Sequence, residues 1–447
     1  MKVEGQATMV GVIGTGHVGL VTCVSLAEIG HRVIGYDQDP EKISQLRSGS
    51  APFHEPGLRE LLARGLASQR LSFTDDVADC VRGAKVVFIC VGTPPRAGGE
   101  ANLVAVERAV RDIARHADGP CVIVEKSTVP TGTAARVKAT MQRENPERAA
   151  ELVVVSNPEF LREGQAIQDA MRPERILIGA ESAAGFETMR RLYGPLIANG
   201  SQVFEFDVST AELAKYACNA FLALKISFIN ALARICEQAQ ADVVAIAEVM
   251  GSDPRIGRAF LDAGIGYGGS CFPKDLQAFD RVARRLGYEF PLLREVARIN
   301  DEAVEAIARK INDALWNFEG KRIALLGLAF KPGTDDIRFS PALVLASKLV
   351  SEGAHVVGYD PIAEHNAKAE MPQLEVASSA LDALAGASCA VVCTDWDEIK
   401  QLDLSEVRKV MAEAVVVDGR NIFDPDVMQA AGITYYPTGR PPRRVSP

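Results

Sequence analysis

A strand, a glycine turn, a helix and a second strand follow one another within residues 8–40, and this feature constrains the fold more than any other. The apolar residues 9–13 are followed by a glycine turn at 14–19, a helix-like run over 20–29 and a strand-like run over 32–36. This order, within about 30 residues, is typical of one βαβ unit, whose two strands lie parallel in one sheet.

The glycine turn reads Gly14-Thr15-Gly16-His17-Val18-Gly19, and Asp37 lies 18 residues after Gly19, at the end of the second strand. Glycines at these positions permit a tight turn and let the backbone approach a pyrophosphate at the N-terminus of the helix. A carboxylate such as Asp37 binds a ribose 2′-hydroxyl and repels a 2′-phosphate. The pattern predicts a site for NAD, with a turn that serves only packing as the alternative.

Strand-like and helix-length segments continue to alternate along the chain. Strands are expected at 85–91, 121–125 and 152–156, and the alternation returns with a strand at 322–326, a helix at 341–351 and a strand at 355–359. The sequence also repeats itself, because Val-Ile-Gly-Tyr-Asp at 33–37 resembles Val-Val-Gly-Tyr-Asp at 356–360. Strands that alternate with helices indicate parallel, doubly wound sheets.

The sequence between the two α/β segments is helical by pattern. Ser209 and Glu212 have the spacing of a capping box, at the start of a run without Pro or Gly that continues to about residue 241. Helical sequence surrounds the glycine-rich residues 264–269 and ends near residue 318. The predicted fold class is α/β, with two Rossmann-like, doubly wound parallel-sheet domains, 1–208 and 319–447, joined by a long helix and an all-helical middle domain, 209–318.

The composition excludes several classes of protein. Of the 447 residues, 49 are Lys or Arg and 58 are Asp or Glu, which gives a formal net charge of −9. An acidic chain is not expected to bind nucleic acid or an anionic membrane, because that affinity depends on basic patches. No apolar stretch approaches about 20 residues, so no membrane span is expected. The N-terminus lacks the apolar core of a signal peptide.

Cysteine and histidine lack the spacing of a disulfide framework or a metal site. The nine cysteines include no C-x-x-C pair, which indicates reduced thiols and a cytoplasmic protein. The six histidines form no ligand-spaced cluster, so no metal is expected. The Pro- and Arg-rich end of the chain, residues 437–447, is expected to be poorly ordered.

One cysteine stands in a context that favours reactivity. Cys271 follows the glycine-rich segment 266–269 and precedes Lys274 and Asp275. A nearby ammonium favours the thiolate, which is the nucleophilic form of cysteine. These residues leave two interpretations open, a reactive thiol or a small buried side chain.

Polar residues follow several of the predicted strands. Thr93, Thr128 and the pair Glu159 and Glu163 stand at such positions, where open α/β sheets bind ligands. The two carboxylates are either acid/base groups or part of a helix N-cap.

Cations and an amide occupy further candidate positions. Lys215 and Asn219 are four residues apart and share one face of the long helix, either as a functional pair or as a solvated polar stripe. Lys331 and Arg420 follow predicted strands of the C-terminal segment, either as partners for phosphates or as surface charges.

Taken in chain order, these segments resemble the UDP-glucose/GDP-mannose dehydrogenase family from about residue 9 to residue 420. The resemblance rests on the segments 14–20, 91–94, 126–133, 157–164, 215–219, 266–275, 330–338 and 418–420. The residues Gly-Gly-Ser-Cys-Phe-Pro-Lys-Asp at 268–275 and Arg-Pro-Glu-Arg-Ile at 172–176 are similar to the UDP-glucose branch.

The resemblance implies a four-electron oxidation of UDP-glucose to UDP-glucuronate with two NAD. An aldehyde cannot lose a second hydride until it becomes tetrahedral, and a cysteine thiolate makes it so by forming a thiohemiacetal. The second hydride transfer leaves a thioester that water hydrolyses. The resemblance also implies a homodimer or higher homo-oligomer through the middle domain, a C-terminal domain that binds the UDP-sugar, and a role in polysaccharide biosynthesis.

The resemblance further assigns roles to single residues. Cys271 is the implied nucleophile, Lys215 the group that stabilises the oxyanion, and Asp275 and Glu159 the groups that position water or exchange protons. The implied catalytic residues are Cys271, Lys215, Asp275, Glu159, Thr128 and Asn219. The implied NAD contacts are Gly14, Gly16, Val18, Gly19, Asp37, Lys42, Thr93, Thr128, Glu163, Lys274 and Arg338. The implied UDP-glucose contacts are Glu159, Phe160, Leu161, Arg162, Glu163, Lys215, Asn219, Arg255, Phe260, Leu261, Gly264, Tyr267, Gly268, Phe330, Lys331 and Arg420, with Arg255 and Arg420 reaching a neighbouring subunit's site in some members.

Two positions depart from the family pattern, and other activities remain as alternatives. His17 stands where the family usually has Tyr, as an altered cofactor contact or a solvent-facing turn residue, and Asp262 stands where relatives often carry Asn or Lys. The nearest alternative is the same chemistry on GDP-mannose or a UDP-N-acetylhexosamine. A two-electron hydroxyacid dehydrogenase and a non-catalytic NAD or nucleotide-sugar sensor are the others.

Overall fold

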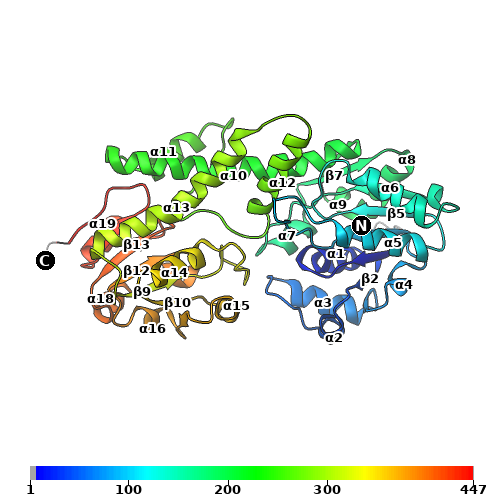
Figure 1. Ribbon diagram of the computed structural model, residues 1–447. Coiled ribbons are helices and arrows are strands. Elements are labelled where there is room, and N and C mark those ends of the chain that lie inside the picture. Colours follow the sequence, from blue (N-terminus) through cyan, green and yellow to red (C-terminus); the bar gives the residue numbers. More distant parts are fainter. Residues whose placement is uncertain (1–6, 446–447) are drawn as a thin grey trace. The chain divides into compact units, whose positions relative to one another are not determined.

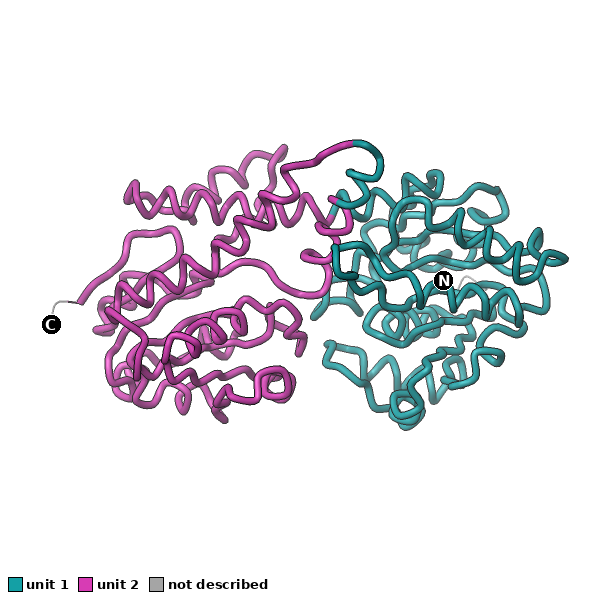
Figure 2. Tube along the Cα trace, viewed as in Figure 1, with its two compact units in different colours: residues 1–218, 281–287 teal, residues 219–280, 288–447 magenta. Residues whose placement is uncertain are grey.

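The computed structural model describes residues 7–445, which fold into two compact units (Figure 2). The first unit contains the residues up to Cys218 together with Arg281–Gly287, and the second contains Asn219–Asp280 together with the residues from Tyr288 onward. Helix α10 (Val208–Ala239) begins in the first unit and continues in the second. The division into three domains at residues 208 and 318 stays a prediction.

The first unit is built on one sheet with the strand order β3-β2-β1-β4-β5-β6-β7-β8 (Figure 1). Neighbouring strands are parallel except β6 and β7, which pair antiparallel. The strands are β1 (Met9–Ile13), β2 (Arg32–Tyr36), β3 (Leu71–Thr74), β4 (Val86–Ile89), β5 (Cys121–Glu125), β6 (Leu152–Ser156), β7 (Arg175–Ala180) and β8 (Gln202–Phe206). The helices are α1 (His17–Glu28), α2 (Pro40–Arg47), α3 (Leu58–Ala67), α4 (Val77–Val81), α5 (Val104–His116), α6 (Thr133–Glu144), a 3₁₀ turn (Ala149–Glu151), α7 (Ala166–Met171), α8 (Ala183–Leu192) and α9 (Gly194–Ala198).

Both faces of this sheet are buried, which explains why its strands are continuous apolar runs. In β4, Val86 and Phe88 pack into one hydrophobic cluster, while Val87 and Ile89 pack into a second. Successive side chains of a strand point to opposite faces of the sheet. The two clusters are therefore the two cores between the sheet and the helices that cover its faces. The strand order changes direction between β1 and β4, and ligands of such sheets bind at the carboxyl ends of the strands at this point.

The second unit combines helices with a smaller sheet of order β11-β10-β9-β12-β13-β14, in which all neighbours are parallel. Its strands are β9 (Arg322–Leu326), β10 (His355–Tyr359), β11 (Glu375–Val376), β12 (Cys389–Val392), β13 (Val415–Asp418) and β14 (Thr434–Pro437). Besides most of α10, its helices are α11 (Val243–Gly251), most of α12 (Phe272–Arg285), α13 (Pro291–Leu315), α14 (Pro341–Ser351), α15 (Glu364–Glu370), α16 (Ala380–Leu384), α17 (Asp397–Lys400), α18 (Leu404–Val410) and α19 (Pro425–Ala430). The predicted fold class is confirmed.

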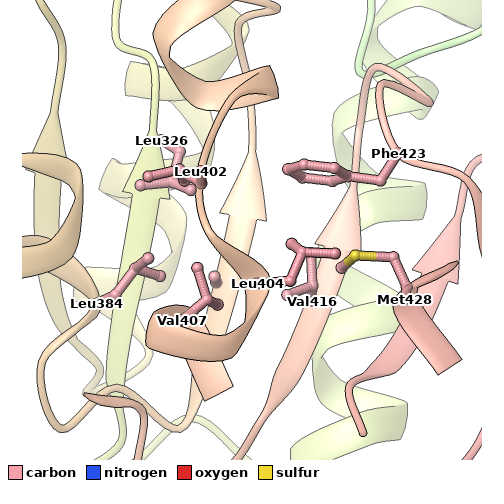
Figure 3. Close-up of a pocket in the computed structure, with 9 residues that line it drawn as sticks. Leu326, Leu384, Leu402, Leu404, Val407, Val416, Phe423 and Met428 are labelled. Carbon is pink, nitrogen blue, oxygen red and sulfur yellow. The ribbon is translucent and has the colours of Figure 1, made fainter. Parts of the chain in front are cut away.

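A small cavity lies against this second sheet, among residues of α16, α18 and α19 (Figure 3). Its lining is wholly apolar and consists of Leu326, Leu384, Ala390, Leu402, Leu404, Val407, Val416, Phe423 and Met428. An apolar void of this kind offers no hydrogen-bonding group to a polar ligand, so it belongs to the core.

Helix α10 is long and apolar enough to cross a membrane by length and composition alone. However, 44% of its most apolar window is buried inside the structure, and Lys215, Asn219 and Asn230 on this helix are among the buried polar residues. Core helices of soluble proteins have the same character.

The capping box predicted at the start of α10 is wrong. The helix begins at Val208, and the carboxylate of Asp207 accepts hydrogen bonds from the backbone N–H and the hydroxyl of Thr210. Asp207 therefore takes the role that the sequence pattern gave to Ser209.

Glu212, the other half of the predicted box, caps a different helix. Its carboxylate accepts hydrogen bonds from the backbone N–H groups of Gly132, at 2.8 Å, and Ala134, at 3.2 Å, at the start of α6. Helix α6 begins after Gly132, which has no side chain to cap it, so the nearby carboxylate of α10 satisfies its free N–H groups.

The expectation of poor order at the C-terminal end is wrong for residues 437–445. Arg443 forms a β-bridge with Tyr435, the backbone N–H of Gly439 donates to Glu237 at 2.8 Å, and Arg440 donates to Asp242 at 3.0 Å. The basic side chains of Arg440 and Arg443 find acidic partners at the start of α11 and in α19, which composition alone does not reveal. Residues 446–447 lie outside the described part of the chain.

Candidate active site

The glycine turn between β1 and α1 has the geometry of a phosphate-binding loop. Gly14 has a φ of +94°, and a Cβ on Gly19 would lie 1.8 Å from the carbonyl oxygen of Gly14. Gly16 is the N-cap of α1 and supplies no side-chain hydrogen bond, and the first turn of α1 contains no acidic residue. The first N–H groups of α1 are therefore available to an anion, and the turn fits the pyrophosphate of a dinucleotide.

Asp37 is held against this turn as the sequence predicts. Its Oδ2 accepts hydrogen bonds from the backbone N–H and the hydroxyl of Thr15, at 2.9 and 3.0 Å, and lies 3.0 Å from Nζ of Lys42. Burial alone would raise the pKa of Asp37, but the bonds from Thr15 and Lys42 outweigh it and hold the pKa below its usual value. An ionised carboxylate at the end of β2 fits a ribose hydroxyl.

The loops that follow β4 and β5 are joined by hydroxyl groups. The Thr93 hydroxyl donates to the carbonyl oxygen of Thr128 at 3.0 Å, and the Ser127 hydroxyl donates to the carbonyl oxygen of Val91 at 2.7 Å. The structure therefore brings together Thr93 and Thr128, which the sequence predicted separately at two strand ends.

Glu159 and Lys215 form a buried ion pair within the first unit. Oε1 of Glu159 lies 3.0 Å from Nζ of Lys215, and the two side chains are 7% and 5% exposed. Burial would raise the pKa of Glu159, but Lys215, the backbone N–H of Leu161 and Lys126 together hold it below its ordinary value. Glu159 is thus a buried carboxylate, which can accept a proton.

The residues after Glu159 form a charged loop. The ring of Phe160 lies 5.3 Å from Nζ of Lys215 and 4.3 Å from the guanidinium of Arg175. The backbone N–H of Gly164 donates to Glu55 at 2.7 Å, which ties the loop to the segment before α3. Arg162 instead pairs with Asp169, and this pair takes up its guanidinium in the structure.

In the second unit, Asp275 is the centre of a buried polar cluster. It is 2% exposed, accepts a hydrogen bond from Nδ2 of Asn219 at 2.6 Å, and lies 2.5 Å from Nζ of Lys274. The carbonyl oxygen of Cys271 accepts the backbone N–H of Asp275, so the thiol lies one helical turn before this cluster, directly ahead of α12. Cys271 is half-buried, and a helix N-terminus favours an anion.

Glycines let the loop before Cys271 pack closely against the loop that follows β9. A Cβ on Gly268 would lie 2.3 Å from the carbonyl oxygen of Phe339, and Gly269 has a φ of +79° and donates its N–H to the carbonyl oxygen of Arg338. A Cβ on Gly269 would also lie 2.8 Å from the ring of Phe330. Only glycine fits both positions, which explains the paired glycines in the sequence.

Arg420 joins three loops of the second unit through carbonyl oxygens. Its guanidinium donates to Cys393 at 2.7 Å, Phe330 at 3.2 Å and Gly266 at 3.4 Å. Gly264 lies in the same region, because a Cβ there would meet the carbonyl oxygen of Gly419 at 2.5 Å. Several of the predicted sugar-nucleotide residues are thus gathered at the carboxyl ends of β9, β12 and β13.

The second sheet is not a second dinucleotide site, although its sequence repeats that of the first. Asp360, which matches Asp37, is 1% exposed. Its carboxylate accepts hydrogen bonds from the N–H groups of Leu328, Ala329, Ile362 and Ala363 and from the indole of Trp396. A carboxylate with all these internal partners has no capacity left for a ribose.

The side chains of three other predicted residues make local contacts of their own. Arg255 is 87% exposed and pairs with Asp253, while Arg338 pairs with Asp336. Phe260 has a φ of +66°, and its ring lies 6.3 Å from that of Phe272. Of the remaining predicted contacts, Val18 lies in the first turn of α1, and the others lie in loops: Glu163, Leu261, Tyr267 and Lys331.

The two departures from the family pattern have local partners. The His17 ring stacks on Phe53, with centroids 4.6 Å apart, and its Nε2 lies 3.1 Å from Glu55, so the interpretation as a solvent-facing turn residue is wrong. Asp262 pairs with Arg258, which also binds Glu248.

The sequence matches three consecutive domains of one family. Residues 8–197 match the NAD binding domain, residues 209–302 the central domain, and residues 324–425 the UDP binding domain of the UDP-glucose/GDP-mannose dehydrogenase family. The chain belongs to this family.

Relatives share nearly the whole length of the chain. The UDP-glucose 6-dehydrogenase TuaD of Bacillus subtilis is 44% identical over 433 residues, which cover 97% of this chain and 93% of that protein. The UDP-glucose 6-dehydrogenase of Rhizobium meliloti is 45% identical and covers 96% of this chain and 99% of its own. A solved UDP-glucose dehydrogenase from the archaeon Pyrobaculum islandicum is 36% identical, with a TM-score of 0.91 and coverage of 98% of this chain and 99% of that one.

Membership of the UDP-glucose/GDP-mannose dehydrogenase family confirms several predictions at once. The protein is an NAD-dependent oxidoreductase, its N-terminal domain is the NAD binding domain, and its C-terminal domain is the UDP binding domain. Bound NAD supplies the acceptor for a hydride. Within residues 7–445, no group of three or more His, Cys, Asp and Glu side chains could hold a metal ion.

Two charged residues of the family's N-terminal domain were missed from the sequence. Glu125 is 1% exposed, and its carboxylate lies near Glu212; Lys126 places its ammonium 3.2 Å from Oδ1 of Asn157. Glu125 is the last residue of β5 and Lys126 directly follows it, so the strand-end rule that selected Thr93 would also have selected Lys126.

Proposed function

We propose that the protein oxidises UDP-glucose to UDP-glucuronate with two NAD, through a covalent intermediate on Cys271. The observation that supports this most is the position of Cys271, directly before α12 and one turn from the cluster of Asp275, Lys274 and Asn219. The full-length identity of 44% and 45% to UDP-glucose 6-dehydrogenases supports the substrate.

The first oxidation converts the C6 alcohol to an aldehyde. The hydroxyl proton leaves to a base while a hydride leaves C6. The thiolate of Cys271 then adds its electron pair to C6 and forms a C–S bond, and the carbonyl oxygen becomes an oxyanion. An ammonium is the natural partner for this charge, and we assign that role to Lys215.

The second oxidation and hydrolysis complete the reaction. The thiohemiacetal loses a hydride from C6 and becomes a thioester. Water then adds to C6, passes one proton to Glu159, and the C–S bond breaks with its electron pair returning to sulfur. The acid that is released loses its proton and leaves as the carboxylate. Burial would raise the pKa of Glu159, but Lys215 and the Leu161 N–H lower it. A lowered pKa fits a group that must begin the step as a base.

Counting NADH tests this function. Purified protein with NAD and limiting UDP-glucose is expected to release two NADH for each UDP-glucose. GDP-mannose and UDP-N-acetylglucosamine are not expected to be oxidised at rates comparable to that of UDP-glucose. One NADH for each substrate would indicate a two-electron dehydrogenase, and binding without NADH would indicate a sensor. Cys271→Ser is expected to lose nearly all net turnover, whereas Cys218→Ser, at the other half-buried cysteine, keeps it.

We further infer a cytoplasmic homodimer, or a higher homo-oligomer, formed through α10. Phe221, Phe228 and Ile235 are 61%, 51% and 63% exposed and follow one another at intervals of seven residues. Apolar residues at this spacing form a stripe along one side of a helix, and a stripe of this kind is typical of a helix that packs against another.

A further inference from the structure

Lys126 is a half-buried lysine that the proposed reaction does not yet use. It directly follows β5, and its backbone N–H donates to the carbonyl oxygen of Ile89 at 3.1 Å. Its ammonium lies 3.2 Å from Oδ1 and 3.5 Å from the carbonyl oxygen of Asn157, and 5.9 Å from the ring centroid of Phe88. Lysine is rarely buried without a partner, because removing the charge from water is costly.

Asn157 links Lys126 to the loop that carries Glu159. It is 2% exposed, and its Oδ1 accepts hydrogen bonds from Lys126 and from the Tyr193 hydroxyl at 2.7 Å. Its Nδ2 donates to the carbonyl oxygen of Leu177 at 2.7 Å. Only Pro158 stands between Asn157 and Glu159, so bonds from β5, β7 and the start of α9 fix the main chain from which the Glu159 side chain projects.

The charge of Lys126 also acts on Glu159. Burial lowers the pKa of Lys126, and Cys90 and Glu159 act against this, while Lys215 adds to it. On Glu159 the effects of Lys215, the Leu161 N–H and Lys126 outweigh burial. Glu159 is therefore paired with Lys215, and the charge of Lys126 adds to the effect of that pair.

The other titratable groups near Lys126 do not neutralise it. Burial raises the pKa of the Cys90 thiol to about 12, although Lys126 and Thr22 oppose the shift. Burial, followed by Cys90, also raises the pKa of the Tyr193 hydroxyl. Both groups are neutral at the pH of the cell, so neither offsets the charge of Lys126 as the Glu159 carboxylate does.

We propose that Lys126 is a positioning residue for Glu159: it fixes the loop that carries Glu159 through Asn157, and its ammonium supplies positive charge near that loop during the hydrolysis of the thioester. This inference rests on the proposed function. When water attacks C6 and Glu159 takes its proton, the positive charge of Lys215 and Lys126 favours the oxyanion that forms.

Neutral and charged substitutions at Lys126 test the role of the charge. In Lys126→Gln the amide can still donate to Asn157 but has no charge, and in Lys126→Arg the charge remains. Loss of a nearby opposite charge raises the pKa of a carboxyl group, by about one unit or more when the charge lies within about 6 Å. The acidic limb of the kcat profile is therefore expected to move up by about one pH unit in Lys126→Gln and to stay in place in Lys126→Arg.

Rapid mixing identifies the step that is affected. Hydrolysis follows both hydride transfers, and Lys126→Gln removes a charge that favours the oxyanion of hydrolysis. This variant is therefore expected to show a burst of two NADH for each active site and then a slow steady state. KM for UDP-glucose and for NAD is expected to stay within about twofold of the wild-type value, because Lys126 is not among the residues assigned to bind either ligand. Tyr193→Phe is the matched control, because it removes a bond to Asn157 without changing charge and is expected to leave the acidic limb in place.

Three results would overturn the proposal. The first is an acidic limb of the Lys126→Gln profile that coincides with that of the wild type, and the second is a limb that moves equally in Lys126→Arg. The third is a Lys126→Gln protein that loses the initial burst of NADH instead of slowing in the steady state. If Lys126→Gln does not fold, the wild type still decides, because a hydrolysis step whose acidic limb lies above the ordinary glutamate value of about 4.3 contradicts an ionised Glu159. If the proposed function itself is wrong, the wild-type protein would instead release a number of NADH other than two for each UDP-glucose.

Discussion

Glu125 and Glu159 lie near the ends of β5 and β6, and burial tends to raise the pKa of both carboxyl groups. The partners of each group decide whether its pKa is raised or lowered. Glu159 has the ammonium of Lys215 at 3.0 Å and remains ionised. Glu125 is 1% exposed, and neither of its carboxylate oxygens has a hydrogen-bond partner among residues 7–445. Burial, and then the nearby Glu212, raises the pKa of Glu125 to about 8. Glu125 is thus protonated at neutral pH, while Glu159 is not.

Glu125→Gln is expected to change how stability depends on pH. The folded-state pKa of about 8 lies above the unfolded value, so the unfolded chain releases this proton first and Glu125 makes stability fall as pH rises from about 4.5 to about 8. Its contribution is up to about 1.4 kcal/mol for each pH unit in that window and is constant above it. Glutamine cannot ionise, so the variant loses this part of the dependence.

Urea unfolding between pH 5 and pH 8.5 measures this effect. The free energy of unfolding of Glu125→Gln is expected to gain on that of the wild type toward pH 8. Glu147→Gln, at an exposed position, is the control and should run parallel to the wild type. Parallel curves for Glu125→Gln would mean that Glu125 is ionised in the folded protein.

Single residues were predictable from the sequence where the backbone imposes the requirement. Gly14 and Asp37 follow from the shape of a βαβ turn, and the structure places them as expected. The charge states of Glu125 and Lys126 were not predictable, because they depend on Glu212 and on Glu159, which are distant in sequence.

At the scale of elements, the exposed apolar residues along one side of α10 predict that the protein forms an oligomer through this helix. Phe228→Asp places a charge among Phe221, Phe228 and Ile235, and a charge buried in an apolar contact costs several kcal/mol. The wild type is expected to have at least twice the mass of the monomer in light scattering, and Phe228→Asp is expected to shift toward the monomer. Val427→Asp, at an exposed apolar residue of α19, should keep the mass of the wild type. A monomeric wild type, or an unchanged mass for Phe228→Asp, would contradict the interface.

Elements were predicted well where local pattern determines them. The strands β5, β6, β9 and β10 and helix α14 have the bounds that the apolar runs predicted. The capping box of α10 failed because Glu212 found the uncapped start of α6, a partner that lies about 80 residues away in sequence. The antiparallel pairing of β7 with β6 likewise depends on tertiary packing, so the alternation of strands and helices does not predict it.

At the scale of the whole molecule, one architecture occurs twice with two different uses. Asp37 at the end of β2 faces an uncapped glycine turn, whereas Asp360 at the end of β10 is saturated by backbone N–H groups and an indole. The repeat was visible in the sequence, but this difference depends on Trp396 and the loop after β9. Family membership and the two sheets agree on an NAD binding domain and a UDP binding domain.

The central claim is that sulfur carries the substrate between the two oxidations. Mass spectrometry of protein quenched with acid during turnover of UDP-glucose and NAD tests it most directly, with Lys126→Gln used to slow hydrolysis. The peptide that contains Cys271 is expected to gain the mass of a UDP-glucuronyl thioester, and the Cys271→Ser protein to gain none. An unmodified Cys271 peptide throughout active turnover, with two NADH still released for each UDP-glucose, would contradict the account.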